Sequence, residues 1–368
     1  MKKNYISIIA TFFITITALA QNGNPATPYY SGFDWTLTGA PLKNALSTIT
    51  ISKHTNLLSY TPGVWEASKI TDLDPLNSAN VILVYGFENG TDALVTNDRT
   101  RSKLSQGGNN GNWNREHVYA KSLGTPVLLD GGTANNSSSD AGEDAHHLRP
   151  ADVQWNSQRG NKKFAAGLGN SGDVAAGWYP GDEWKGDIAR MMMYMYLRYG
   201  NQCLPTGVGT GSSSISDTNM LNLFLQWNVE DPVSQFEDNR NIYHDSNGTY
   251  AQGNRNPFID NPYLATIIWG GTAAENRWPS VFLSTNSFEL IADINVYPNP
   301  TSDQKINIET ENELDQIQVI NINGQIMQQI SKPVRNQNKY TLENLPQGFY
   351  FLKLSSENKS IVKKIVIN

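Results

Sequence analysis

The sequence predicts an α+β fold in its larger N-terminal part and a small all-β domain at its C-terminal end. Between residues 41 and 278, several segments carry apolar residues at helical spacing, and one continuous apolar run has the length of a buried strand. From residue 294 onward, short alternating runs are separated by turn-forming residues. We therefore expect a domain of helices and strands at residues 21–285, a linker at residues 286–293 and a β-sandwich at residues 294–368.

Residues 1–20 have the order of segments that a secretory signal peptide requires. Two lysines follow Met1, an apolar run extends from Ile6 to Leu19, and small residues precede Gln21. No later stretch approaches the roughly 20 consecutive apolar residues that a membrane-spanning helix needs. We expect an exported protein without an integral membrane anchor. Cys203 is its single cysteine, so no internal disulfide can form.

Helical spacing predicts the main elements of the larger domain. The expected helices are residues 41–60, 151–163, 186–200 and 220–227, and the second of them is expected to start at Pro150. The segment 186–200 is apolar around most of its circumference, which predicts a central buried helix. Residues 81–86 form the continuous apolar run and are expected to be a central strand.

Four charged or titratable residues in this domain are open to interpretation. Arg190 lies in the middle of the expected buried helix, so it either pairs with a neighbour or points towards an anionic site. Arg240 and Arg255 lie in polar turns, and we interpret them as members of ion-pair networks. His54 lies at the polar end of the first expected helix and is interpreted as structural.

The C-terminal part contains alternating runs of strand length at residues 305–308, 316–322, 348–354 and 361–367. Turns are expected at Asn323-Gly324 and at residues 346–348. The runs predict a separate all-β domain.

Two short segments concentrate the residues that could carry chemistry. The first, residues 112–122, places Arg115, Glu116 and His117 in succession. The second, residues 144–161, contains two histidines, two arginines and two asparagines, which are His146, His147, Arg149, Arg159, Asn156 and Asn161. Three of the five histidines of the chain lie in these segments. Because histidine titrates near neutral pH, this concentration points to proton transfer or metal binding.

Phosphodiester hydrolysis with one divalent cation is the chemistry that fits these residue types. A neutral histidine can take a proton from water, while a hard cation held by carboxylate and amide oxygens neutralises charge on the phosphate. Glu116 and Asn156 supply oxygens of that kind. The sequence contains neither a His-Glu-x-x-His zinc motif nor a Gly-x-Ser-x-Gly nucleophile motif.

The charge of the chain limits how a nucleic acid could be held. The formal net charge is −6; residues 21–292 carry −8, and residues 293–368 are neutral. A broad basic groove is therefore not expected, and phosphate binding must depend on a few arginines and a cation.

The motifs at residues 113–122, 144–150 and 156–161 resemble those of the bacterial endonuclease I family, whose members have a ββα-metal core. Residues 186–190, 231–232 and 253–260 resemble its later blocks, and the likeness covers roughly residues 40–280. The resemblance implies that His117 is the general base and that Glu116 and Asn156 bind Mg²⁺ or a similar ion such as Ca²⁺ or Mn²⁺, with Asn161 as a rival ligand.

The same resemblance implies further contacts with the substrate. Some members place an arginine after the histidine to hold the cleaved phosphate, whereas residues 122–143 of this chain contain no arginine or lysine. Arg149 or Arg159 is expected to substitute as a catalytic residue. Arg115, His146, His147 and Asn161 are expected to contact the substrate.

The C-terminal part resembles a type IX secretion sorting domain, on the Asn295-Val-Tyr-Pro-Asn-Pro300 opening and the Lys363-Lys364 ending. The resemblance implies that the outer-membrane secretion machinery is a partner and that the protein reaches the cell surface or the medium. The sequence as a whole predicts a secreted, monomeric, metal-dependent endonuclease that cuts DNA, and RNA as a second substrate. Two alternatives stay open: a phosphodiesterase for RNA or small nucleotides, and an exported adhesin or glycan-binding protein with a structural ion.

Overall fold

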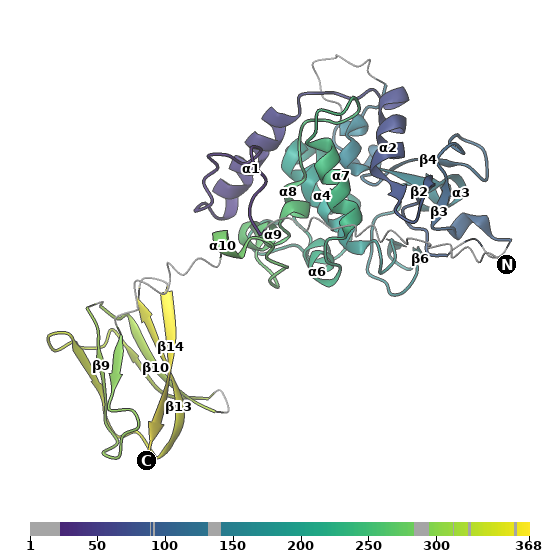
Figure 1. Ribbon diagram of the computed structural model, residues 1–368. Helices are drawn as coiled ribbons and strands as arrows, with labels where there is room; N and C mark the ends of the chain where they lie inside the picture. Colours follow the sequence, from purple (N-terminus) through teal and green to yellow (C-terminus); the bar gives the residue numbers. More distant parts are fainter. Residues whose placement is uncertain are drawn as a thin grey trace, which may run out of the picture. The chain divides into compact units, whose positions relative to one another are not determined.

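The computed structural model describes residues 23–88, 90, 93–131, 141–282, 294–311, 313–322, 325–356 and 359–368. The expected signal peptide, the expected linker and the Asn323-Gly324 turn lie outside these residues. The chain divides into two compact units, Met1–Val281 and Phe282–Asn368. The first mixes helices with small sheets and the second contains strands, so the predicted α+β fold with an all-β C-terminal part is confirmed (Figure 1). No helix among the described residues has the length and apolar character needed to cross a membrane.

The first unit is built around one buried helix. Its helices are α1 (Gly39–Lys53), α2 (Trp65–Thr71), α3 (Val153–Arg159), α4 (Lys185–Tyr199), α5 (Pro205–Val208), α6 (Asn222–Glu230), α7 (Gln235–His244), α8 (Pro257–Asp260), α9 (Tyr263–Trp269) and α10 (Pro279–Phe282). Every residue of α4 from Gly186 to Leu197 is buried, which confirms the predicted central helix. In its middle, Arg190 donates to both carboxylate oxygens of Glu237 at 2.6 and 2.8 Å. Arg190 is therefore paired with a neighbour.

Three small antiparallel sheets accompany these helices. They are β1 (Leu73–Asp74) with β2 (Asn77–Ile82) and β3 (Thr100–Ser102), β4 (Trp113–His117) with β5 (Leu148–Asp152), and β6 (Gly172–Val174) with β7 (Gly177–Tyr179). The strand predicted at residues 81–86 is wrong beyond Ile82. There the chain turns through Tyr85, whose φ of 71° is left-handed and ends the extended conformation.

The strands β4 and β5 and the helix α3 form one continuous ββα unit. Glu116 pairs with Arg149 and His117 with Leu148 in the antiparallel register. The helix predicted to start at Pro150 starts at Val153 instead. Pro150 belongs to β5, and the side chain of Asp152 caps the helix by accepting from the backbone N–H groups of Gln154 and Trp155. In Figure 1, β4 and α3 lie beside β2 and β3, at one side of the first compact unit.

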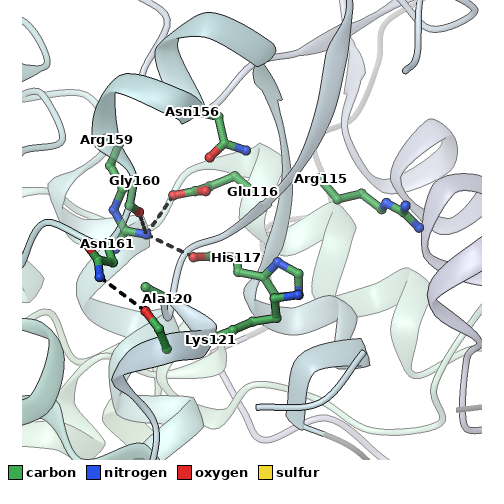
Figure 2. A pocket seen from close by; sticks show the side chains of 10 residues that line it. Arg115, Glu116, His117, Ala120, Lys121, Asn156, Arg159, Gly160 and Asn161 are labelled. Carbon is green, nitrogen blue, oxygen red and sulfur yellow. Dashed lines mark hydrogen bonds and ion pairs between the residues drawn. The ribbon is translucent and has the colours of Figure 1, made fainter. Parts of the chain in front are cut away.

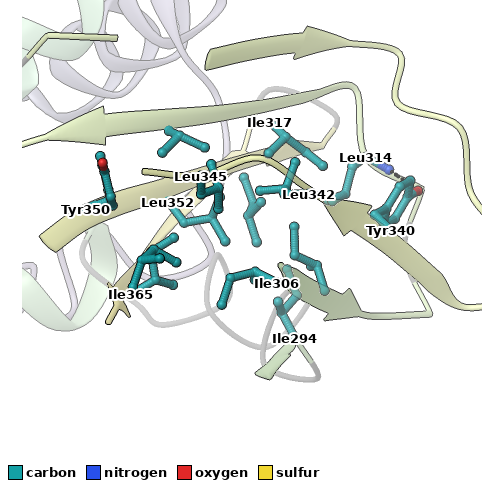
Figure 3. Close-up of a cluster of buried hydrophobic side chains, with 14 residues drawn as sticks. Ile294, Ile306, Leu314, Ile317, Tyr340, Leu342, Leu345, Tyr350, Leu352 and Ile365 are labelled. Atoms are coloured by element: carbon teal, nitrogen blue, oxygen red, sulfur yellow. Dashed lines mark hydrogen bonds between the residues drawn. The ribbon is translucent and has the colours of Figure 1, made fainter. Parts of the chain in front are cut away.

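The second unit is a sandwich of two antiparallel sheets. One sheet has the order β11 (Ile326–Ser331), β10 (Gln316–Asn321), β13 (Gly348–Ser356), β14 (Lys359–Ile367), and the other has β12 (Lys339–Leu342), β9 (Ile306–Glu309), β8 (Asn295–Tyr297). Alternate residues of the strands point inward and form an aliphatic core between the sheets (Figure 3). Leu352 and Ile365 are fully buried there, while Phe349 and Val362 face outward. The sequence runs predicted four of these strands and missed β8, β11 and β12.

Candidate active site

A pocket of about 290 Å³ opens where the end of β4 meets α3 (Figure 2). Its walls come from the end of β4, the turn that follows it and the C-terminal half of α3. The lining residues are Arg115, Glu116, His117, Ala120, Lys121, Ser122, Asn156, Arg159, Gly160 and Asn161. Two segments that are about forty residues apart in the sequence thus contribute to one cavity.

His117 is held so that one of its ring nitrogens can accept a proton. Its Nε2 lies 2.9 Å from the carbonyl oxygen of Gly142. A carbonyl oxygen only accepts, so Nε2 carries the hydrogen and Nδ1 keeps its lone pair. Burial, followed by the neighbouring His147, holds the pKa of His117 well below its usual range. The ring is therefore neutral at neutral pH, as a general base must be.

Tyr60 and Arg115 fix the other side of this ring. The rings of Tyr60 and His117 are stacked, with centroids 5.4 Å apart. The guanidinium carbon of Arg115 lies 3.5 Å from the centroid of Tyr60 and 4.1 Å from that of Trp65. Arg115 also donates to the carbonyl oxygen of Tyr60 and, at 3.0 Å, to the hydroxyl of Thr61. In Figure 2 its guanidinium points away from Glu116 and Asn156.

Glu116 is a buried carboxylate with one oxygen left over. Its Oε1 accepts from the hydroxyl of Tyr85 at 2.9 Å and pairs with Nη1 of Arg159 at 3.1 Å. No partner is found for Oε2 among the described residues. Burial raises the pKa of Glu116 to about 7, although Arg159 and the Tyr85 hydroxyl act against this rise. A bound cation would favour the charged form.

The side-chain amide of Asn156 is oriented by a neighbour that sequence reasoning missed. Its Nδ2 donates to Oδ1 of Asn114 at 2.8 Å, which leaves the Oδ1 of Asn156 as an acceptor on the pocket side. One carboxylate oxygen and one amide oxygen suit a hard cation such as Mg²⁺, which usually keeps several waters and takes few protein ligands. No group of three His, Cys, Asp or Glu residues within the described ranges could hold a metal ion. The donor set therefore fits Mg²⁺ better than zinc.

Arg159 lines the pocket but is committed to the protein. It is fully buried and donates to the carbonyl oxygens of His117 at 3.1 Å and Val118 at 2.9 Å, in addition to pairing with Glu116. Its guanidinium therefore holds the end of β4 and the carboxylate of Glu116 in place. These contacts favour a positioning role for Arg159 over phosphate binding, and its assignment as a catalytic residue stays a prediction.

Three other expected site residues do not join the pocket. Arg149 is fully buried, and it pairs with Asp72 at 2.7 Å and with Asp187 at 3.1 Å. Arg149 is thus paired inside the protein and does not line the cavity, which argues against its expected role as the phosphate-binding arginine.

His146 and His147 are buried and do not line the cavity. The Nε2 of His146 lies 3.1 Å from the carbonyl oxygen of Asn254, and the Nε2 of His147 lies 2.7 Å from that of Ala141. Burial lowers the pKa of both histidines to about 4. We correct their assignment to substrate contact, because neither side chain reaches the cavity.

The remaining expectations concern Asn161 and the residues that were not foreseen. Asn161 lines the pocket, but its Nδ2 donates to the hydroxyl of Ser122 at 3.3 Å and its side chain is exposed.

Lys121 also lines the pocket and was not considered, although it stands four residues after His117. Tyr85 could not be foreseen because it lies thirty-one residues before Glu116.

Comparisons with known proteins agree with this geometry. The profile of the Endonuclease I family matches residues 38–263, and that of the secretion system C-terminal sorting domain matches residues 295–368. The extracellular ribonuclease of Bacillus amyloliquefaciens is 44% identical over 243 residues, which are 63% of this chain and 74% of the relative. The extracellular ribonuclease of Bacillus subtilis is 44% identical over 263 residues, 67% of this chain and 81% of the relative.

A weaker match was found among solved structures. PorZ, a surface component of the type IX secretion system of Porphyromonas gingivalis, is matched over 23% of this chain and 12% of its own, at 13% identity and a TM-score of 0.18. A likeness at that TM-score supports no argument.

Proposed function

Because this chain belongs to the endonuclease I family and is a secreted nuclease, we propose that it hydrolyses the phosphodiester bonds of both RNA and DNA in the pocket around His117, with one divalent cation. The observation that carries this proposal is the shared cavity. The lone pair on Nδ1 of His117, the unpartnered Oε2 of Glu116 and the Oδ1 of Asn156 all belong to residues that line it.

The roles of the residues follow from their contacts. Nδ1 of His117 takes a proton from the attacking water, while the carbonyl of Gly142 keeps the other ring nitrogen protonated. Glu116 and Asn156 would hold the cation. When bound, the cation neutralises charge that develops on the phosphate and its leaving oxygen. Arg159 and Tyr85 orient the carboxylate of Glu116, and Asn114 orients the amide of Asn156.

The substrate range follows from the same roles. Each step uses water as the nucleophile, and none requires the 2′-hydroxyl that distinguishes RNA from DNA. The names of the two Bacillus relatives support RNA as a substrate. The chain's net charge of −6 supports binding through few phosphate contacts. We expect little sequence preference, because the proposed contacts are made to phosphate, which carries no base-specific information. We also propose that the C-terminal unit is bound by the secretion machinery and that the secreted protein is a monomer.

The proposal is tested with RNA and DNA strands of the same sequence, incubated with Mg²⁺ or with a chelator. We expect both strands to be cut with Mg²⁺ and neither with the chelator. The RNA products should carry no 2′,3′-cyclic phosphate, because water attacks rather than the 2′-hydroxyl. Cleavage of RNA alone with cyclic ends would contradict the proposed chemistry, and the absence of cleavage would favour a binding protein.

A further inference from the structure

The pocket needs a positive charge that can reach a phosphate, and its cations differ in how firmly they are held. Three basic side chains line the cavity among the described residues: Arg115, Lys121 and Arg159. Arg159 is fully buried and donates to backbone carbonyls as well as pairing with Glu116. Arg115 is stacked on Tyr60 and donates to the loop that contains Thr61. The Nη1 and Nη2 of Arg159 cannot turn to a substrate without giving up these contacts, and the guanidinium of Arg115 points away from Glu116 and Asn156 (Figure 2).

Lys121 is held by a single ion pair that solvent can reach. Its Nζ lies 2.5 Å from Oδ2 of Asp130, and the two side chains are 40% and 24% exposed. Ion pairs at such positions are worth roughly 0.2–1 kcal/mol, since both charges remain partly hydrated. A phosphodiester anion in the pocket can therefore replace Asp130 as the partner of this ammonium.

The same ion pair places the ammonium beside the general base. Oδ2 of Asp130, which binds Lys121, is also 3.8 Å from Nε2 of His117. Lys121 begins the short helical turn at Lys121–Leu123, directly after the segment that follows β4. In Figure 2 its side chain extends along the wall of the pocket next to His117, on the side opposite Asn156. Lys121 lines the same cavity as His117, Glu116 and Asn156, so its long side chain can turn from Asp130 towards a phosphate bound there.

We propose that Lys121 is a further catalytic residue, whose ammonium leaves Asp130 when substrate binds and donates to a non-bridging oxygen of the phosphate that is cleaved. This inference rests on the proposed function. It assigns to Lys121 the role expected of Arg149, which does not line the cavity, or of Arg159, whose Nη1 and Nη2 donate to the protein. No covalent step is added, because the lysine stays protonated and stabilises the charge of the transition state.

The first test compares kcat and KM of the full chain with Lys121→Ala, Lys121→Arg and Lys162→Ala, at saturating Mg²⁺. Lys162 is a matched control, because its Nζ lies 2.5 Å from Asp173 and its side chain is 41% exposed, yet it does not line the pocket. Loss of one donor to the transition state costs roughly 10²–10³-fold in kcat. We expect a loss of that size for Lys121→Ala, partial recovery with Lys121→Arg, and no change for Lys162→Ala.

The second test measures binding without turnover. In the His117→Ala background, with divalent cation fixed and monovalent salt varied, Lys121→Ala should reduce the slope of log affinity against log salt for a DNA duplex by about 0.9, the value for one phosphate contact. Lys162→Ala should leave the slope unchanged.

The outcomes separate this inference from the function on which it rests. If the wild type cleaves and Lys121→Ala retains its kcat, Lys121 has no catalytic role and the proposed function stands. A rise in KM alone would place Lys121 on a neighbouring phosphate and overturn the assignment. If the wild type cleaves neither RNA nor DNA, the proposed function fails and the inference fails with it.

Discussion

The pocket around His117 and the buried cluster around Asp144 contain the same kinds of residue, yet they differ in what their polar atoms contact. We define the Asp144 cluster as Asp144 with the side chains that surround it, which are His54, His146, Tyr194, Tyr199, Gln252 and Asn254. The hydroxyls of Tyr194 and Tyr199 donate to Oδ2 of Asp144 at 2.8 and 2.9 Å, and Gln252 donates to Oδ1 at 3.0 Å. Its carboxylate is thus satisfied from several sides.

The pocket is built in the opposite way. Nδ1 of His117, Oε2 of Glu116 and Oδ1 of Asn156 belong to side chains that are fixed through their other polar atom. Although burial favours the neutral acid, nearby histidines and hydrogen bonds hold the pKa of Asp144 well below its usual range, whereas burial raises that of Glu116 to about 7. Unused polar atoms alone do not mark a site, because Nδ1 of His54 in the Asp144 cluster also has no hydrogen-bond partner among the residues that the structure describes. The difference teaches that fixed side chains with unused acceptors mark a site where they line a cavity.

The largest expected effect is that of removing the carboxylate in the pocket. Glu116→Gln should remove several kcal/mol of transition-state stabilisation, which lowers the cleavage rate by on the order of 10³-fold. Chelation of divalent ions should have the same effect on the wild type. Glu183→Gln removes an exposed carboxylate outside the site and should leave the rate unchanged. An equal loss of cleavage rate in both variants would mean that the net charge of the protein, and not a carboxylate in the pocket, determines the rate.

The two asparagines give a sharper version of the same test. Asn156→Ala should raise the Mg²⁺ concentration needed for half-maximal rate by roughly 10–100-fold, since an oriented ligand is lost. Asn161→Ala should leave this requirement unchanged, because its amide is exposed and bonded to Ser122. A reversed result would exchange the two roles. The readout is the rate titrated with Mg²⁺.

A buried ion pair should show the next largest effect, on stability instead of rate. Arg149→Met removes the arginine that contacts Oδ2 of Asp187 and Oδ1 of Asp72, so it should lower the free energy of unfolding by about 3–5 kcal/mol. Arg99→Met breaks an exposed pair with Glu183 and should cost about 1 kcal/mol or less. Urea unfolding of both variants measures the difference. A lower cleavage rate in folded Arg149→Met would show that this arginine does contribute to catalysis.

Acid should lower the free energy of unfolding because of two buried histidines, His146 and His147. The folded pKa of His146 and of His147 is about 4, below the value of 6.5 for an exposed histidine. The unfolded chain therefore binds protons first as pH falls below 6.5, and stability that is complete above this pH is lost between 6.5 and 4. Each histidine contributes up to about 3 kcal/mol. Urea unfolding at pH 7.5 and 4.5 checks the direction, and equal stability at the two values would contradict it.

The smallest effect is expected from removing the C-terminal unit. Deleting residues 293–368 should leave a folded enzyme with an unchanged rate, because the compact unit that contains the pocket ends at Val281. A slower rate in a truncated chain of unchanged thermal stability would show that the β-sandwich helps to bind the substrate.

The sequence indicated where a site lies better than it indicated which residues share a cavity. Glu116, His117 and Asn156 were proposed from their types and order, and they line one pocket. The buried helix was predicted because its apolar residues leave no polar face. His147 was misplaced because its position directly before β5 does not reveal that its ring lies outside the cavity. Its ring centroid is 5.7 Å from that of His117, but His147 does not line the cavity.

Arg149 and Lys121 show the same limit from two directions. Nothing local in the sequence reveals that Asp72, seventy-seven residues away, neutralises Arg149. The orientation of Lys121 depends on Asp130 and on the cavity, which also form only in the fold. Burial and long-range pairing therefore decide which of several similar residues are functional.

The central claim is that His117, and not the nearby His147, is the general base. Its most direct test compares these two histidines, whose ring centroids lie 5.7 Å apart. Rates of RNA and DNA cleavage per folded molecule should be measured for His117→Ala and His147→Ala, with the folded fraction taken from unfolding curves at the same pH. We predict that His117→Ala loses roughly 10²–10⁴-fold in rate and keeps its stability, since it removes a general base. His147→Ala should lose stability and keep its rate per folded molecule. A fully active His117→Ala, or an equal loss of rate in folded His147→Ala, would contradict the account.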